Sequence, residues 1–173
     1  MARGVHWAIA LLLGVWLMGC QPQTMRVGEP VTIKTVLSGQ TVAVLWRNEA
    51  LTVRLAGIDA PDRRQAPWGE QARAALTQQL AAPEPLYLEP SDPERDRYGR
   101  QWGYLWQGDR LINIWLVEQG YVLARREPMA AYTEQLSHAQ DYARMMATGI
   151  WQPDNPLRQT PQEFRAQGAA AEN

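Results

Sequence analysis

Three closely spaced strand patterns run into one charged segment, and this arrangement limits the folds available to the chain. Residues 31–37 alternate apolar and polar side chains, residues 41–46 form a second apolar run, and residues 51–58 form a third. Alternation with a period of two is typical of strands, and the short polar turns between these runs connect neighbouring antiparallel strands. The sequence therefore predicts a three-stranded meander that ends at Asp59.

The end of this meander, V-R-L-A-G-I-D-A-P-D at residues 53–62, combines a cation with two carboxylates. Arg54 lies in the apolar strand pattern, whereas Asp59 and Asp62 lie in the turn that follows it. An arginine and acidic residues at a strand end indicate a site for a phosphate and a metal ion. The alternative is that Arg54 only pairs with one of the two aspartates on a solvated face, where such pairs contribute little.

The rest of the chain predicts an α+β fold. A helix should follow the meander, then two more strands, then two helices. Five strands with a helix after the third are the order expected for a five-stranded OB-fold β-barrel with about three packed helices. The predicted segments are helix 68–82, strands 86–89 and 101–106, and helices 111–119 and 129–148.

The N-terminus has the layout of a secretory signal, with Arg3, the apolar run 8–18 and then Cys20. L-M-G-C at residues 17–20 resembles the lipobox of bacterial lipoproteins, in which the cysteine is lipidated. Cys20 is the only cysteine, so it cannot form an internal disulfide. The alternatives are an uncleaved anchor, or a cleaved signal with a stray cysteine.

These patterns predict four segments and a location. Residues 1–19 are expected to be a lipoprotein-type signal peptide cleaved before Cys20, 20–29 a tether, 30–152 the folded domain and 153–173 a disordered tail. The expected location is the cell envelope, with a lipid anchor on the outer membrane or facing the periplasm, or else secretion. The formal net charge of −1 gives no support for non-specific binding to duplex DNA through clustered cations.

R-L-A-G-I-D-A-P-D at residues 54–62 and D-R-Y-G-R at residues 96–100, with three further motifs in order along the chain, resemble the staphylococcal nuclease (thermonuclease) family. The resemblance covers residues 31–151 and implies calcium-dependent hydrolysis of phosphodiester bonds in DNA and RNA on a five-stranded OB barrel with three helices. It implies nucleic acid as the substrate, and a monomer is expected. The motifs are R-L-A-G-I-D-A-P-D at 54–62, G-E-Q-A at 69–72, D-R-Y-G-R at 96–100, N-x-x-L-V-x-x-G at 113–120 and G-I-W at 149–151.

The resemblance also implies roles for individual residues. Arg54 and Arg100 match the two arginines that contact the scissile phosphate. Asp59 matches a metal ligand, and Ala60 matches the residue whose carbonyl binds the same metal. Asp62 lies where the family has a glutamate associated with the attacking water, and its side chain is shorter by one methylene.

A second departure from the family concerns the predicted metal site. The D-G-D-T turn of the family reads S-G-Q-T at residues 38–41, so Gln40 replaces a metal-binding aspartate. An amide oxygen can bind calcium or another divalent cation but adds no charge. Two hypotheses therefore stand. One is a nuclease with an altered metal site, and the other is a weak or inactive OB module that binds single-stranded nucleic acid or an envelope partner.

Additional substrate contacts are expected on the later part of the barrel. Arg95, Arg97 and Tyr98 lie in a charged segment that is most simply a solvated loop but can contact the substrate. Three aromatic residues alternate along the predicted strand 101–106, and they form either a stacking platform or part of the core. They are Trp102, Tyr104 and Trp106.

Overall fold

The computed structural model of the chain describes residues 27–125 and 131–171. The predicted signal peptide, Cys20 and residues 20–26 of the predicted tether lie outside the described residues. Within the described ranges, no helix combines the length and the apolar character needed to cross a membrane.

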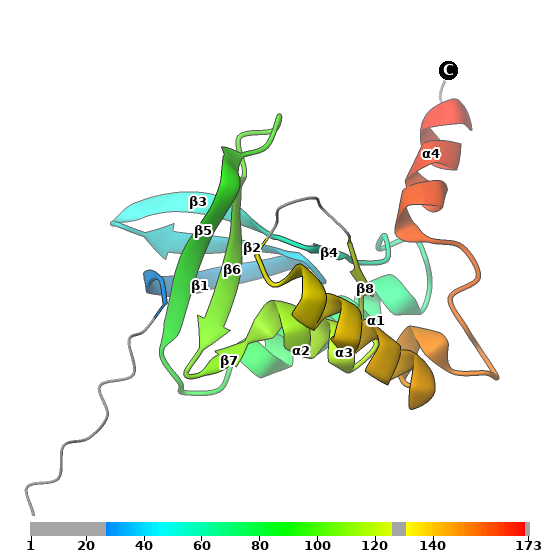
Figure 1. Cartoon of the computed structure of the whole chain (residues 1–173). Helices are drawn as coiled ribbons and strands as arrows, with labels where there is room; N and C mark the ends of the chain where they lie inside the picture. The colour runs from blue at the N-terminus through cyan, green and yellow to red at the C-terminus, as the bar shows by residue number, and fades with distance from the viewer. Residues whose placement is uncertain (1–26, 126–130, 172–173) are drawn as a thin grey trace, which may run out of the picture.

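Five strands form a closed barrel (Figure 1). Antiparallel pairing gives the order β3-β2-β1-β5-β6, and β3 then pairs with β6 in parallel, from Val53 opposite Gln101 to Leu55 opposite Gly103. This pairing closes the barrel and confirms the predicted five-stranded OB-type fold. The strands are β1 (Glu29–Ser38), β2 (Thr41–Trp46), β3 (Glu49–Leu55), β5 (Leu86–Arg95) and β6 (Gln101–Gln107).

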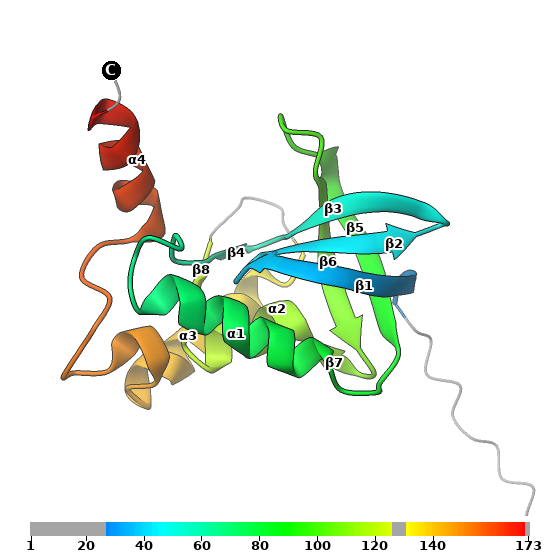
Figure 2. The ribbon, with the colours of Figure 1, turned by 180° about the vertical axis from the view of Figure 1, so that it is seen from behind.

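The helices confirm the α+β class, although the described residues contain four α-helices where about three were predicted. In Figures 1 and 2, α1, α2 and α3 lie together beside one end of the barrel, whereas α4 stands apart from them. The helices are α1 (Trp68–Leu80), α2 (Ile112–Glu118), α3 (Thr133–Met145) and α4 (Pro161–Ala171), with a 3-10 turn η1 (Gly149–Trp151). Three short strands are β4 (Ile58–Asp59), β7 (Arg110–Leu111) and β8 (Leu123–Ala124).

One main hydrophobic core joins the barrel to the first three helices. Leu55 from β3 is fully buried, together with Leu76 of α1, Leu116 of α2 and Leu136 of α3. In α1, the buried positions Ala72, Leu76 and Leu80 recur every four residues. This is the spacing of one helix face, so the predicted amphipathic helix packs as expected.

The predicted strand over residues 51–58 is interrupted before the charged turn. Gly57 has a φ of +71°, a left-handed conformation that glycine adopts without steric cost. The chain then leaves the barrel and forms β4, which pairs with β8 so that Asp59 lies opposite Leu123. This break moves Asp59 off the barrel wall and places it at the mouth of the barrel next to β3.

The prediction of a disordered tail over residues 153–173 is wrong for Pro161–Ala171, which form α4. Thr160 and Glu163 form a reciprocal capping box, in which the Glu163 carboxylate accepts hydrogen bonds from the Thr160 backbone N–H and hydroxyl, both at 2.8 Å. Proline suits the first helical position, because its missing N–H would have no partner there. The tail composition is weak in apolar anchors, but these local signals start a helix.

Candidate functional site

The centre of the site is the ion pair between Arg54 of β3 and Asp59 of β4. The Arg54 Nη2 and Asp59 Oδ1 atoms are 3.4 Å apart, and the two side chains are only 13% and 11% exposed. Arg54 lies opposite Trp102 in the parallel β3–β6 pairing, which fixes its position on the barrel rim. The pairing with an aspartate that the sequence allows therefore exists, but it is buried and not on a solvated face.

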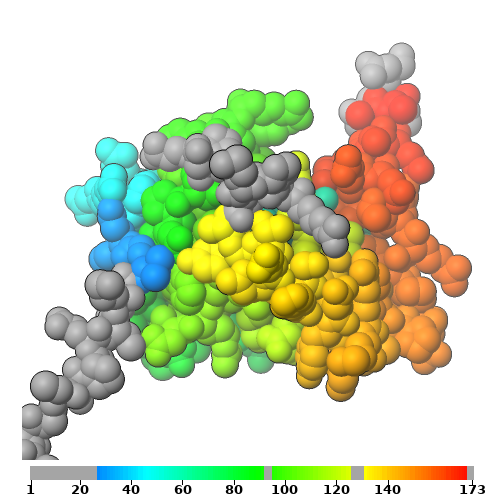
Figure 3. Space-filling model, viewed as in Figure 1, coloured from blue at the N-terminus to red at the C-terminus, as the bar shows by residue number. Residues whose placement is uncertain are grey.

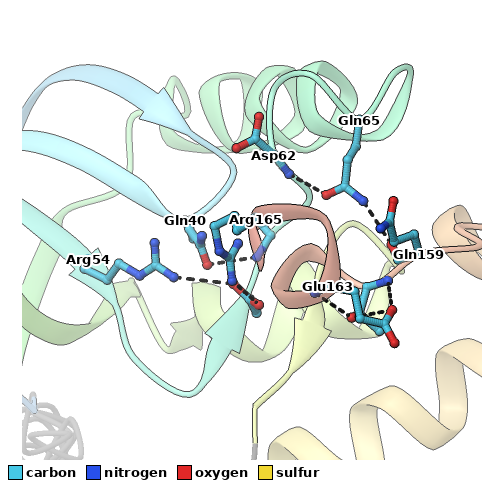
Figure 4. A network of polar contacts seen from close by, with 10 residues as sticks. Gln40, Arg54, Asp62, Gln65, Gln159, Glu163 and Arg165 are labelled. Carbon is cyan, nitrogen blue, oxygen red and sulfur yellow. Dashed lines mark hydrogen bonds and ion pairs between the residues drawn. The ribbon is translucent and has the colours of Figure 1, made fainter. Parts of the chain in front are cut away.

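A third residue, Arg165 of α4, completes this charged cluster. Its Nη2 atom lies 3.0 Å from Oδ1 and 2.7 Å from Oδ2 of Asp59. Figure 4 shows the Arg54 and Arg165 side chains approaching each other from β3 and α4. Arg165 was not predicted as a site residue, because it lies in the segment expected to be disordered. The capping box of α4 can nevertheless be recognised in the sequence as T-P-Q-E at residues 160–163.

Arg54 keeps its charge at neutral pH despite its burial. Desolvation lowers the pKa of Arg54 to about 10, against the opposing effect of the Asp59 charge. The positive charges of Arg100, Arg165 and Arg125 contribute to the lowering. These positive charges lie close enough to repel one another, so a bound anion would stabilise all of them.

Gln40 supports the turn after β4 through its side chain. Its Oε1 atom accepts a hydrogen bond of 2.8 Å from the Ala60 backbone N–H, and the side chain is buried. The preceding Gly39 lets this turn lie against α1, because a Cβ there would lie 2.5 Å from the Cβ of Ala72. Gln40 therefore has a structural role as an acceptor, and its role as a metal ligand stays a prediction.

Asp62 is held by its own neighbours. Its Oδ1 atom accepts hydrogen bonds of 3.0 Å from both the backbone N–H and the Nε of Arg64. These bonds, led by the one from the Arg64 side chain, lower the pKa of the Asp62 carboxyl. Figure 4 shows Asp62 apart from Arg54, with no contact drawn between the two side chains. The side chain is thus ionised and paired with Arg64, and its catalytic role stays a prediction.

The donors predicted for calcium do not fit that ion as they are arranged. Calcium requires six to eight oxygen ligands and favours carboxylates. Asp59 is bonded through both oxygens to Arg165, and the Gln40 oxygen is bonded to Ala60. Among the side chains that the structure describes, no three His, Cys, Asp or Glu residues gather to hold a metal. The Asp59 carboxylate is therefore paired with the guanidinium groups of Arg165 and Arg54 and not with other carboxylates.

Arg100 is brought to the site by a tight turn between β5 and β6. The Asp96 Oδ1 atom accepts the backbone N–H groups of Tyr98 at 2.8 Å and Arg100 at 3.0 Å. The Arg100 Nε donates to Asp96 Oδ2 at 2.7 Å. Gly99 makes the turn possible with its φ of +75°. The D-R-Y-G-R motif thus builds a rigid support for one arginine.

Arg54, Arg100 and Arg165 line one open cleft of about 700 Å³. Figure 3 shows a hollow between the green tip of β5 and β6 and the red α4. Of the predicted substrate contacts, Tyr98 is 67% exposed and lines the cleft, with the Arg97 guanidinium 4.8 Å from its ring centroid. The lining residues are Arg54, Asp96, Arg97, Tyr98, Arg100, Trp102, Arg125 and Arg165.

Arg95 supports the turn and is not part of that lining. Its Nη1 donates to the Gly99 carbonyl oxygen at 3.1 Å. The aromatic residues of β6 divide between the two roles left open by the sequence. Tyr104 is buried and contacts Tyr132 edge to face at 4.8 Å, whereas Trp102 lines the cleft. Within the alternating set, Trp102 is the candidate for contact with a ligand.

Comparison with known proteins agrees with this geometry. Residues 52–153 match the family model described as staphylococcal nuclease homologue. A thermonuclease of Staphylococcus intermedius is 28% identical over 155 residues, which cover 84% of this chain and 92% of that protein. A micrococcal nuclease of Shigella flexneri is 32% identical over 155 residues, with 84% of each chain covered. Protein ParB of Escherichia coli is 32% identical over 133 residues, which cover 72% of this chain and 71% of that protein. With a closed five-stranded barrel, an arginine-lined cleft at its rim and these matches, the chain belongs to the staphylococcal nuclease family.

Proposed function

We propose that the protein is a nuclease that hydrolyses phosphodiester bonds of DNA or RNA in the cleft between Arg54 and Arg100. The observation that carries this proposal is the lining of the cleft, which has five arginines and one aspartate in a chain whose formal net charge is −1. Two relatives named as a thermonuclease and a micrococcal nuclease support it. Five of the 17 basic residues of the chain therefore meet in one cleft.

The arginines supply the electrostatic part of such a reaction. Attack of water on a phosphodiester increases the negative charge on the non-bridging oxygens, and fixed hydrogen-bond donors aimed at those oxygens lower the barrier. Arg54 is held by burial and Asp59, and Arg100 is held by Asp96, so both are fixed before substrate binds. Dependence on a divalent cation is not part of this proposal, because the described donors do not fit one.

Purified protein is expected to cleave single-stranded DNA or RNA, and Arg100→Ala is expected to reduce kcat/KM about a hundredfold. This is the effect of removing one donor that stabilises transition-state charge. Cleavage of labelled oligonucleotides should be measured with calcium, magnesium, manganese or a chelator. Arg158→Ala is the matched control, because it removes the same charge from an exposed position outside the cleft lining.

The arrangement of the carboxylates favours a second candidate, a module that binds single-stranded nucleic acid without cleaving it. Asp59 is engaged by Arg165, and Asp62 is engaged by Arg64. Tight binding of oligonucleotides, with no cleavage under any of the metal conditions, would support this candidate and contradict the nuclease proposal. Cleavage that is lost in Arg100→Ala would rule it out.

We also propose that the protein is anchored to the cell envelope through a lipid on Cys20. The L-M-G-C sequence at residues 17–20 and the absence of any other cysteine support this proposal. Protein purified from a bacterial membrane fraction should have a mass above that of residues 20–173, whereas Cys20→Ser should leave the membrane fraction. An unmodified mass for the wild-type protein would contradict the anchor.

A further inference from the structure

We propose that Arg165 of α4 is a phosphate-binding residue of the cleft, and that it provides, without a metal ion, the positive charge that offsets Asp59. The inference deepens the proposed function and rests on it for the choice of ligand, a single-stranded nucleic acid. It assigns a binding role to a residue that lies outside the matched family region, which ends at residue 153.

The contacts of Arg165 leave part of its guanidinium available to a ligand. Both bonds to Asp59 use the Nη2 atom, so Nε and Nη1 are free of that carboxylate. The side chain is 38% exposed and lines the cleft together with Arg54 and Arg100. A planar guanidinium can donate to a carboxylate and to a phosphate through different N–H groups. Arg165 can therefore contact both at once.

The position of Arg165 is set by several contacts of α4, not by one surface side chain. The Gln65 side chain donates to the Gln159 carbonyl oxygen at 2.9 Å, just before the helix begins. Pro161 is buried, and the Arg64 guanidinium lies 5.4 Å from the Phe164 ring centroid. Figure 4 shows Gln65 and Gln159 on the same side of α4 as the loop that carries Asp62. The helix is thus attached beside the cleft at both the loop and Asp59.

Charge explains why this arrangement favours phosphate over a divalent cation. A cation that approaches Asp59 has to displace a guanidinium bonded to both carboxylate oxygens, and it is repelled by Arg54 on the other side. A phosphate is attracted by all the arginines that line the cleft and contacts them without breaking the Asp59 pair. The site therefore binds the nucleic-acid backbone in the presence of a chelator.

The test is the binding of a fluorescent oligothymidylate, measured by anisotropy in the presence of a chelator over a range of salt concentrations. Arg165→Ala is expected to weaken binding about tenfold or more, because a hydrogen bond to a charged group contributes about 1.5–3 kcal/mol. The slope of log K against log salt should fall by about 0.7, the value for one lost phosphate contact with a single strand. Arg165→Lys should keep the slope, since it keeps the charge, and Arg158→Ala should change neither quantity.

Two results would overturn the proposal. One is an unchanged affinity and slope for Arg165→Ala, and the other is a gain of calcium-stimulated cleavage in that variant with no loss of binding, which would make Arg165 an inhibitor of a metal site. A loss of slope in Arg165→Lys as well as in Arg165→Ala would show that the docking of α4, not the charge, matters, and would also overturn it. The oligothymidylate carries phosphorothioate linkages, which keep the backbone charge and resist hydrolysis, so binding is measured separately from cleavage. A wild-type protein that binds this probe but cleaves no natural oligonucleotide contradicts the proposed function and not the role of Arg165.

Discussion

Arg54→Ala is expected to reduce the cleavage rate at least a hundredfold while the protein stays folded. The Arg54 side chain is 13% exposed, less than Arg100 at 27% and Arg165 at 38%, and it is fixed between the barrel rim and Asp59. Removal of one preorganised donor typically costs about 3 kcal/mol of transition-state stabilisation. Asp59 keeps its bonds to Arg165 in this variant, so the substitution leaves no isolated buried carboxylate.

Single-turnover cleavage and urea unfolding of the same preparation separate a loss of catalysis from a loss of stability. Arg54→Lys keeps the charge but loses the planar fork of donors, so it should recover only part of the rate. Arg158→Ala should cleave at the wild-type rate. If Arg54→Ala kept more than about a tenth of the wild-type rate, Arg54 would not be a donor to the transition state.

The strands of the barrel could be predicted from the sequence because the patterns that indicate them lie within each strand segment. Period-two alternation predicted β1 and an apolar run predicted β2. The turn between them packs where Gly39 permits close approach to α1. The family motifs then identified Arg54 and Arg100, which the structure brings to one cleft. The break at Gly57 was not predicted, because its flanking residues are as apolar as the strand itself and only the pairing of β4 with β8 reveals it.

The position of α4 could not be predicted from the same signals. The contact between Arg165 and Asp59 joins residues 106 positions apart, and no local pattern encodes a contact of that range. The capping box at Thr160 predicts only that a helix starts there. Its docking depends on Gln65, which bonds to the Asp62 backbone on one side and to Gln159 on the other. The start of α4 could thus be predicted from the sequence, whereas its position beside Asp59 depends on the tertiary structure.

The second large effect is expected from Asn113→Leu, which should lower the free energy of unfolding by about 2–6 kcal/mol. Asn113 is fully buried at the start of α2 and connects the barrel strands to that helix. Its Nδ2 donates to the Ala56 carbonyl oxygen at 2.8 Å, and its Oδ1 accepts the Leu105 backbone N–H at 3.0 Å. Leucine has a similar size but leaves both backbone groups buried without that partner, and each such group costs about 1–3 kcal/mol.

Urea unfolding followed by circular dichroism measures this loss. The midpoint should fall while the slope with denaturant stays the same, because the folded state and the exposed area are preserved. Asn155→Leu makes the same chemical change at an exposed position and should stay within about 0.5 kcal/mol of wild type. An equal effect of the two substitutions would show that the lost hydrogen bonds are not the cause. A large loss confined to Asn113→Leu would establish that Asn113, the first residue of the N-x-x-L-V-x-x-G motif, stabilises the junction of the barrel and α2 through its two backbone hydrogen bonds.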